Sequence, residues 1–216
     1  MGFVLIKIDF MIEREIKTMK KIFIRFIKLL SKFIKRDNKL ITLLFKGYSG
    51  SNLSPLIEQF ESEGFKDYKI KVLRVDSRKF NSASKLDKFY TIKDRYVKYK
   101  YVLKSELIIT THGFYRLRDD NKMINLWHGI PLKSMGLMNK MKSDEVGIVK
   151  DDYFLSTSEF FNTIMNACIG IRAEKYYIAG YPRNDYLFNQ DGVKNLEKLT
   201  GKNINKKIIP WFFGNY

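Results

Sequence analysis

The chain has 216 residues, 45% of them hydrophobic, which is enough to bury one core of ordinary size but hardly enough for two full domains. Its seventeen phenylalanines and thirteen tyrosines exclude a disordered or collagen-like chain. The formal net charge of +17 favours a polyanionic partner, which could be nucleic acid, an anionic lipid surface or a phosphate-rich substrate.

The first predicted element is an amphipathic helix over residues 12–35, with Phe, Ile and Leu on one side and Lys and Arg on the other. This pattern is typical of a helix that lies in the interface of an anionic membrane. The alternative is a helix packed on the protein's own core, with lysines on its solvated face. The residues predicted to bind the membrane are Lys17, Lys20, Lys21, Phe23, Arg25, Phe26, Lys28, Leu30, Lys32 and Phe33.

From residue 39 onward, short apolar strands alternate with helices. The continuous apolar run over residues 40–45 is typical of a strand buried in a parallel sheet. Further strands are predicted at 69–75, 107–111, 123–127, 153–157 and 176–179, and helices at 53–63, 82–104 and 160–169. This alternation predicts an α/β fold, a Rossmann-like doubly wound parallel sheet with helices on both faces.

Both histidines of the chain, His112 and His128, directly follow a predicted strand and precede a glycine. Ligands bind such sheets beyond the carboxyl ends of the strands, and glycine lets a substrate approach the imidazole. Each histidine is therefore a candidate for proton transfer or substrate binding, and the alternative is a hydrogen-bonded structural role. No metal site is expected, because carboxylate ligands are missing nearby and the single cysteine, Cys168, is predicted to lie in the core.

Two other loops also follow predicted strands. The loop at 47–52 is rich in Gly and Ser and could bind an anion through its backbone amides, although a plain turn explains it better. In the loop at 179–185, Asn184 or Asp185 is placed to cap the next helix. Arg183 is not needed for capping, which makes it a candidate phosphate ligand.

Two of these loops carry family motifs. The segment 125–136 reads N-L-W-H-G-I-P-L-K-S-M-G and resembles the W-H-G-x-P-L-K-x-x-G signature of the CDP-glycerol glycerophosphotransferase family of teichoic-acid polymerases and primases. The segment 180–185, G-Y-P-R-N-D, is similar to a second motif of that family and lies about fifty residues further along, as expected. The resemblance extends over residues 40–188.

This resemblance implies the N-terminal domain of a GT-B-type transferase that moves glycerol phosphate from CDP-glycerol to the terminal hydroxyl of a lipid-linked polymer. It implies a peripheral position on the cytoplasmic face of the membrane, and no cofactor besides the donor substrate. The implied catalytic base is His128. The predicted substrate-binding residues are His112, Gly129, Lys133, Arg183 and Asp185.

The family has a second Rossmann-like domain with the nucleotide site, whereas residues 206–209 resemble only its first strand and 210–216 form an aromatic tail. We therefore expect a membrane segment at 1–38 and an acceptor-side domain at 39–205, truncated before the donor site. Another copy or a complementing chain would supply that site. The alternative function is a non-catalytic membrane-surface module that binds anionic lipid or polymer. Specific nucleic-acid binding is not expected, because the charge gathers on the amphipathic helix.

Overall fold

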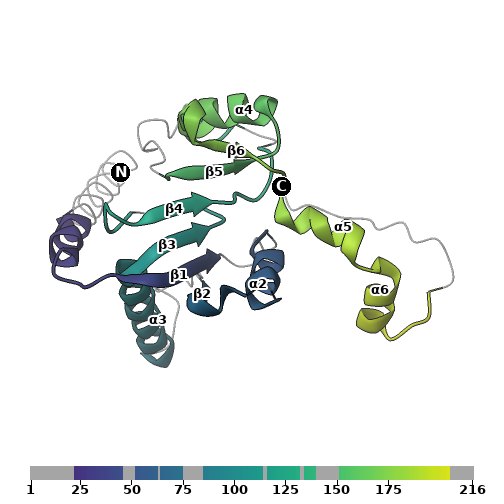
Figure 1. Ribbon diagram of the computed structural model, residues 1–216, viewed down its shortest axis with the longest axis horizontal. Helices are drawn as coiled ribbons and strands as arrows, with labels where there is room; N and C mark the ends of the chain where they lie inside the picture. Colours follow the sequence, from purple (N-terminus) through teal and green to yellow (C-terminus); the bar gives the residue numbers. More distant parts are fainter. Residues whose placement is uncertain are drawn as a thin grey trace, which may run out of the picture.

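The computed structural model describes residues 22–45, 52–62, 64–74, 85–113, 116–131, 134–139 and 151–204. In these residues six parallel strands form one sheet in the order β2-β1-β3-β4-β5-β6, which confirms the predicted doubly wound sheet. The strands are β1 Asp37–Phe45, β2 Lys69–Arg74, β3 Ser105–Thr110, β4 Lys122–Asn125, β5 Tyr153–Ser156 and β6 Tyr176–Ile178. All strands run towards the side where α2 and α5 lie (Figure 1).

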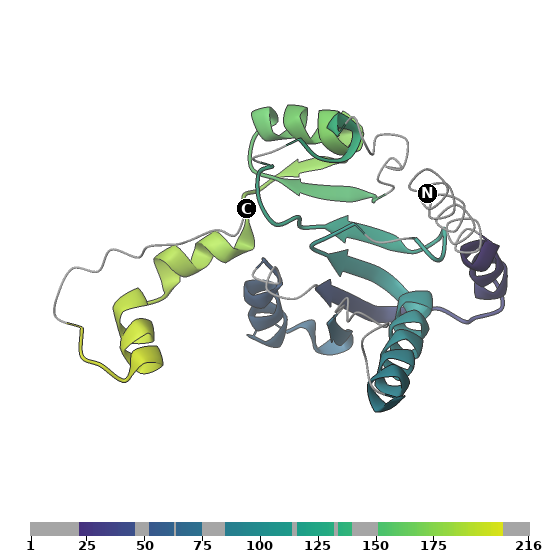
Figure 2. The same cartoon turned by 180° about the vertical axis from the view of Figure 1, so that it is seen from behind.

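Helices connect the strands and cover both faces of the sheet (Figures 1 and 2). The helices are α2 Leu53–Ser62, α3 Lys85–Lys104, α4 Glu159–Ile169, α5 Tyr186–Asn189 and α6 Gly192–Thr200. Short 3-10 turns are η2 Phe65–Asp67, η4 Gly136–Met138, η6 Ala173–Lys175 and η7 Pro182–Asp185. A further helix over residues 22–31 precedes β1 at the amino ends of the strands.

The core forms because β1 is apolar on both of its faces. Leu43 packs with Leu53 of α2, whereas its neighbour Leu44 points to the other face and packs with Val102 of α3. The helix at 22–31 joins the α3 side of the sheet through a half-buried isoleucine, Ile27. Helix α4 covers the β5 end, where its buried cysteine lies in a cluster with Trp127, as predicted for a core residue.

Two predicted carboxyl ends are wrong by two or more residues. The helix predicted to reach residue 35 ends at 31, because a turn over residues 32–34 redirects the chain into β1. The strand predicted to reach residue 127 ends at Asn125, because the amide of Trp127 donates to the Asn125 side chain. Other parts of the predictions lie outside the described residues: 12–21 with Lys17, Lys20 and Lys21, the loop at 47–51, residues 63 and 75, the start of the predicted helix at 82–84, and the tail at 206–216.

Helices α5 and α6 extend away from the sheet as an arm (Figures 1 and 2). None of the α6 residues is buried, and Leu187 and Phe188 of α5 are exposed. The prediction that Asp185 caps the following helix is wrong, since its side chain makes no capping hydrogen bond. The cap instead begins α6, where the Asp191 carboxylate accepts from the amides of Val193 and Lys194 at 3.1 Å. Among the residues described, no helix has both the length and the apolar character needed to cross a bilayer.

Candidate functional site

The two histidines lie against each other at the carboxyl ends of neighbouring strands. His112 follows β3 and His128 follows β4, and these strands pair in parallel with Thr110 beside Asn125. The imidazole rings are stacked, with centroids 4.3 Å apart and an angle of 8° between the ring planes. Both side chains are half-buried, so one edge of the pair stays accessible. The sheet register thus assembles the pair that the sequence analysis selected.

One hydrogen bond determines which nitrogen of His128 is free to act as a base. Its Nδ1 lies 2.8 Å from the carbonyl oxygen of Thr111. Because a carbonyl oxygen only accepts, Nδ1 carries the proton and donates it. In the neutral ring, Nε2 then holds a lone pair that can accept a proton from a substrate hydroxyl. Thr111 is fully buried, so its carbonyl is a rigid partner.

The residue before His128 has an unusual backbone. Trp127 has a φ of 52°, a left-handed conformation that costs a residue other than glycine roughly 1–2 kcal/mol. Its amide donates to the Asn125 side-chain oxygen at 2.9 Å, and its carbonyl accepts from the Asn52 side chain at 2.9 Å. Both asparagines are fully buried. Sequence reasoning missed them, because an asparagine in or after a strand is most simply interpreted as a turn residue.

Arg183 approaches the same peptide from the second motif. Its Nη1 donates to the carbonyl oxygen of His128 at 3.1 Å, and its guanidinium lies 5.1 Å from the ring centre of Tyr181. Gly129 lies beside it with a φ of 151°, a backbone conformation that favours glycine; a Cβ there would make only an ordinary contact, 3.8 Å from Arg183 Nη2. The structure therefore brings His112, Gly129 and Arg183 to His128. Asp185 is exposed at the end of η7 and is not joined to this group, and Lys133 lies outside the described residues.

The buried carboxyl group of Asp151 accepts a hydrogen bond from the Asn125 side chain. Asp151 Oδ2 accepts from the Asn125 amide at 2.9 Å, and only 3% of the Asp151 residue is exposed. Burial raises the pKa of Asp151 from 3.8 to about 6, even though the hydrogen bond from Asn125 opposes this shift. The carboxyl group is therefore held more easily in its neutral form in the folded chain than in the unfolded one.

This shift gives a pH dependence of stability. A raised folded-state pKa means that the stabilisation is complete below about pH 4 and is lost as the pH rises through about 6. Between pH 4 and pH 7, the unfolding free energy of wild type should therefore fall by up to about 3 kcal/mol relative to that of Asp151→Asn, whose side chain does not titrate. Urea denaturation of both proteins across this range measures the difference. A difference that does not change with pH would contradict the expectation.

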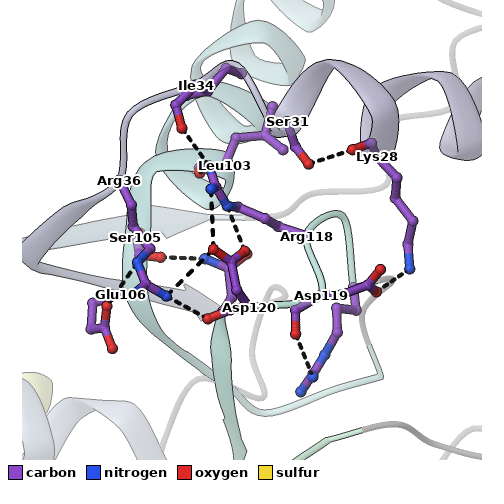
Figure 3. Close-up of polar contacts among 12 residues, drawn as sticks. Lys28, Ser31, Ile34, Arg36, Leu103, Ser105, Glu106, Arg118, Asp119 and Asp120 are labelled. Atoms are coloured by element: carbon purple, nitrogen blue, oxygen red, sulfur yellow. Dashed lines mark hydrogen bonds and ion pairs between the residues drawn. The ribbon is translucent and has the colours of Figure 1, made fainter.

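A second polar cluster lies at the opposite, amino edge of the sheet (Figure 3). The buried guanidinium of Arg118 donates to the carbonyl oxygens of Ile34 at 2.6 Å and Leu103 at 3.2 Å, so it caps the chain after helix 22–31 and the end of α3. It also binds Asp120, and this hydrogen bond lowers the pKa of the Asp120 carboxyl. Lys28 of the helix pairs with Asp119. The helix is thus fixed to the domain at its carboxyl end.

In the described part of the chain, no three His, Cys, Asp or Glu side chains are grouped so that they could hold a metal ion.

Comparisons with known proteins agree with the motifs. The family model described as CDP-Glycerol:Poly(glycerophosphate) glycerophosphotransferase matches residues 26–211. Among curated proteins, no significant match is found.

Solved structures of wall teichoic acid polymerase TagF resemble the fold. A histidine-to-asparagine variant soaked with CDPG for 15 minutes aligns with a TM-score of 0.58 at 14% identity, over 91% of this chain and 54% of that chain. A TagF structure without a named substitution or soak aligns with a TM-score of 0.51 at 14% identity, over 86% and 51%. The chain thus spans about half the length of these structures, and the likeness supports the predicted GT-B-type fold. The family match and both motifs lead to one conclusion: the chain belongs to the CDP-glycerol:poly(glycerophosphate) glycerophosphotransferase family of transferases.

Proposed function

We propose that this chain is the acceptor-side part of an enzyme that transfers glycerol phosphate, or a related polyol phosphate, from a CDP-activated donor to a lipid-linked, teichoic-acid-like acceptor. The observation that carries the proposal is the hydrogen bond from His128 Nδ1 to the Thr111 carbonyl inside the family motif, which leaves Nε2 of the neutral ring unprotonated. An imidazole held in this tautomer is suited to remove a proton from an alcohol.

In the proposed reaction, the terminal hydroxyl of the acceptor attacks the β-phosphorus of CDP-glycerol. A new oxygen–phosphorus bond forms, the bond to the CMP oxygen breaks, and the hydroxyl proton passes to His128 Nε2. Arg183 would stabilise phosphate charge with the guanidinium nitrogens that do not face the His128 carbonyl. His112 and Gly129 complete the proposed substrate site beside His128. Lys133, outside the described residues, and Asp185, which lies apart from this group, are proposed to bind more distant parts of the substrate.

The helix at 22–31 is the proposed membrane contact, on the cytoplasmic face. Of its apolar residues, Ile27 packs on the domain and Phe23 contacts the Tyr99 ring of α3 edge-on, while Phe23, Phe26 and Leu30 stay 44–56% exposed. Phe33, in the turn that follows, is 84% exposed. Exposed basic residues alternate with them, which suits an anionic bilayer. This arrangement favours the surface interpretation over a helix whose whole apolar side covers its own core.

Vesicle sedimentation tests this contact. The double variant Arg25→Glu/Lys32→Glu should bind vesicles of phosphatidylglycerol and phosphatidylcholine at least about 30-fold more weakly, because each basic residue near an anionic leaflet contributes roughly 1 kcal/mol. Lys198→Glu/Lys202→Glu is the control, because it reverses two exposed basic residues at the end of α6, on another surface. Equal losses in both variants, or wild-type protein that stays in solution, would argue against a membrane role for the helix.

The transfer reaction itself is tested with radiolabelled CDP-glycerol and a lipid-linked acceptor on the same vesicles. Extension of the acceptor would support the proposed enzyme. Vesicle binding without transfer, with or without a complementing donor-binding chain, would favour the second candidate, a non-catalytic module that binds anionic lipid or polymer.

A further inference from the structure

We propose that Asn52 is a positioning residue for His128, a role that rests on the proposed function of this histidine. Asn52 directly precedes α2, far from His128 in the sequence, and its side chain is fully buried. Its amide nitrogen holds the two backbone carbonyls that immediately precede the histidine.

Asn52 contacts the two residues that directly follow β4. Asn52 Nδ2 donates to the carbonyl oxygen of Trp127 at 2.9 Å and to that of Leu126 at 3.3 Å. The amide of Leu126 is the last one held by the neighbouring strand, through the Thr110 carbonyl at 2.7 Å. After Leu126, the backbone is held by hydrogen bonds to side chains and no longer by hydrogen bonds to the neighbouring strand. Asn52 therefore takes over the fixing of the backbone at the position where β4 ends.

The backbone at this position needs such a partner. Trp127 keeps its left-handed φ of 52° only if its surroundings over-determine that conformation. Asn125 holds its amide and Asn52 holds its carbonyl, so the peptide groups on both sides of the residue are fixed. Without the Asn52 amide, the peptide between Trp127 and His128 is free to rotate towards an ordinary φ. This rotation would move the imidazole away from the Thr111 carbonyl.

The amide of Asn52 is specific to this task. A buried amide costs free energy unless it is hydrogen-bonded, and a leucine, which has the same number of side-chain heavy atoms and the same branching, would carry no such cost. What asparagine adds at this position is therefore the pair of N–H groups directed at the two carbonyls. The distances place both within hydrogen-bond range, with the shorter bond on the residue next to the histidine.

The experiment uses the fact that the chain contains only two histidines. In protein labelled with ¹⁵N-histidine, NMR reports the tautomer of each ring, and His128→Asn assigns the two signals. In wild type we expect His128 to be protonated at Nδ1 in its neutral form. In Asn52→Leu and Asn52→Ala, this signal should shift to the average of both tautomers seen for a mobile ring. Asn121→Ala is the matched control, because it removes another buried amide that donates to a backbone carbonyl, that of Ser105 at the amino edge.

An unchanged His128 tautomer in folded Asn52→Leu and Asn52→Ala would overturn the proposal. The loss of near-UV circular dichroism in both variants would also overturn it, because Asn52 would then be needed for folding and not specifically for positioning His128. In the transfer assay, the folded variants should lose up to about 100-fold in kcat at unchanged KM for CDP-glycerol. Since the NMR readout needs no activity, a failure of the proposed function and a failure of the positioning role are separate results.

Discussion

Replacing His128 with asparagine is expected to lower the rate of glycerol-phosphate transfer by about 10²–10⁴-fold, the usual contribution of a general base. The asparagine amide can still donate a hydrogen bond towards the Thr111 carbonyl, which His128 contacts at 2.8 Å, so the local packing should survive. What the variant lacks is a nitrogen lone pair able to accept the proton of the acceptor hydroxyl. The loss should therefore appear in kcat, measured as radiolabel incorporated into the acceptor at saturating CDP-glycerol.

The same substitution in the stacked neighbour provides the comparison. His112→Asn removes the ring that lies 4.3 Å from His128 but leaves the base in place. An aromatic pair of this kind contributes about 0.5–1.5 kcal/mol, so the rate should fall by no more than about 10-fold. If His128→Asn lost no more activity than His112→Asn, the assignment of His128 as the base would be wrong.

Gly136→Ala is expected to destabilise the fold by about 3 kcal/mol, the sum of overpacking and an unfavourable backbone conformation. Gly136 has a φ of 58°, and a Cβ at this position would overlap the backbone carbonyl oxygen of Cys168 and stand 3.1 Å from its carbonyl carbon. Backbone atoms at the end of α4 cannot move aside as a flexible side chain would. Gly136, the final glycine of the W-H-G-x-P-L-K-x-x-G signature, thus allows η4 to pack closely against α4.

Gly64→Ala separates the two contributions. Gly64 has a φ of 70°, and a Cβ added there would have no atom within 4 Å, so only the backbone contribution applies, about 1–2 kcal/mol. Urea denaturation of the two variants beside wild type measures both losses. Equal destabilisation would show that η4 can shift away from α4 without cost.

The fold could be predicted from the sequence because its strands are short apolar runs separated by helical patterns. The run at 40–45 lies entirely within β1, and the motif loops lie at the carboxyl edge, as a parallel sheet requires. Hydrophobic periodicity could not show where the N-terminal helix ends, because its apolar pattern continues past residue 31. The stop depends on Arg118, whose side chain binds the Ile34 carbonyl from 84 residues away.

In the site, the motifs identified His128, Arg183 and Gly129, since these residues belong to short contiguous signatures. They could not identify Asn52, which contacts Trp127 across 75 residues, because that contact exists only once α2 and β4 are in register. Nor could they predict the stacking of the two histidines, which depends on the pairing of β3 with β4. Residues that support a reactive group through tertiary contacts carry no local pattern.

The helix over residues 22–31 and the histidine pair lie at opposite edges of the sheet, separated by the run of the strands (Figure 1). The nine residues of β1 span roughly 30 Å at about 3.3 Å per residue. If this helix contacts a bilayer, the histidine pair would lie up to about 30 Å from the lipid surface, and an acceptor anchored in that bilayer would have to span this distance with its own chain.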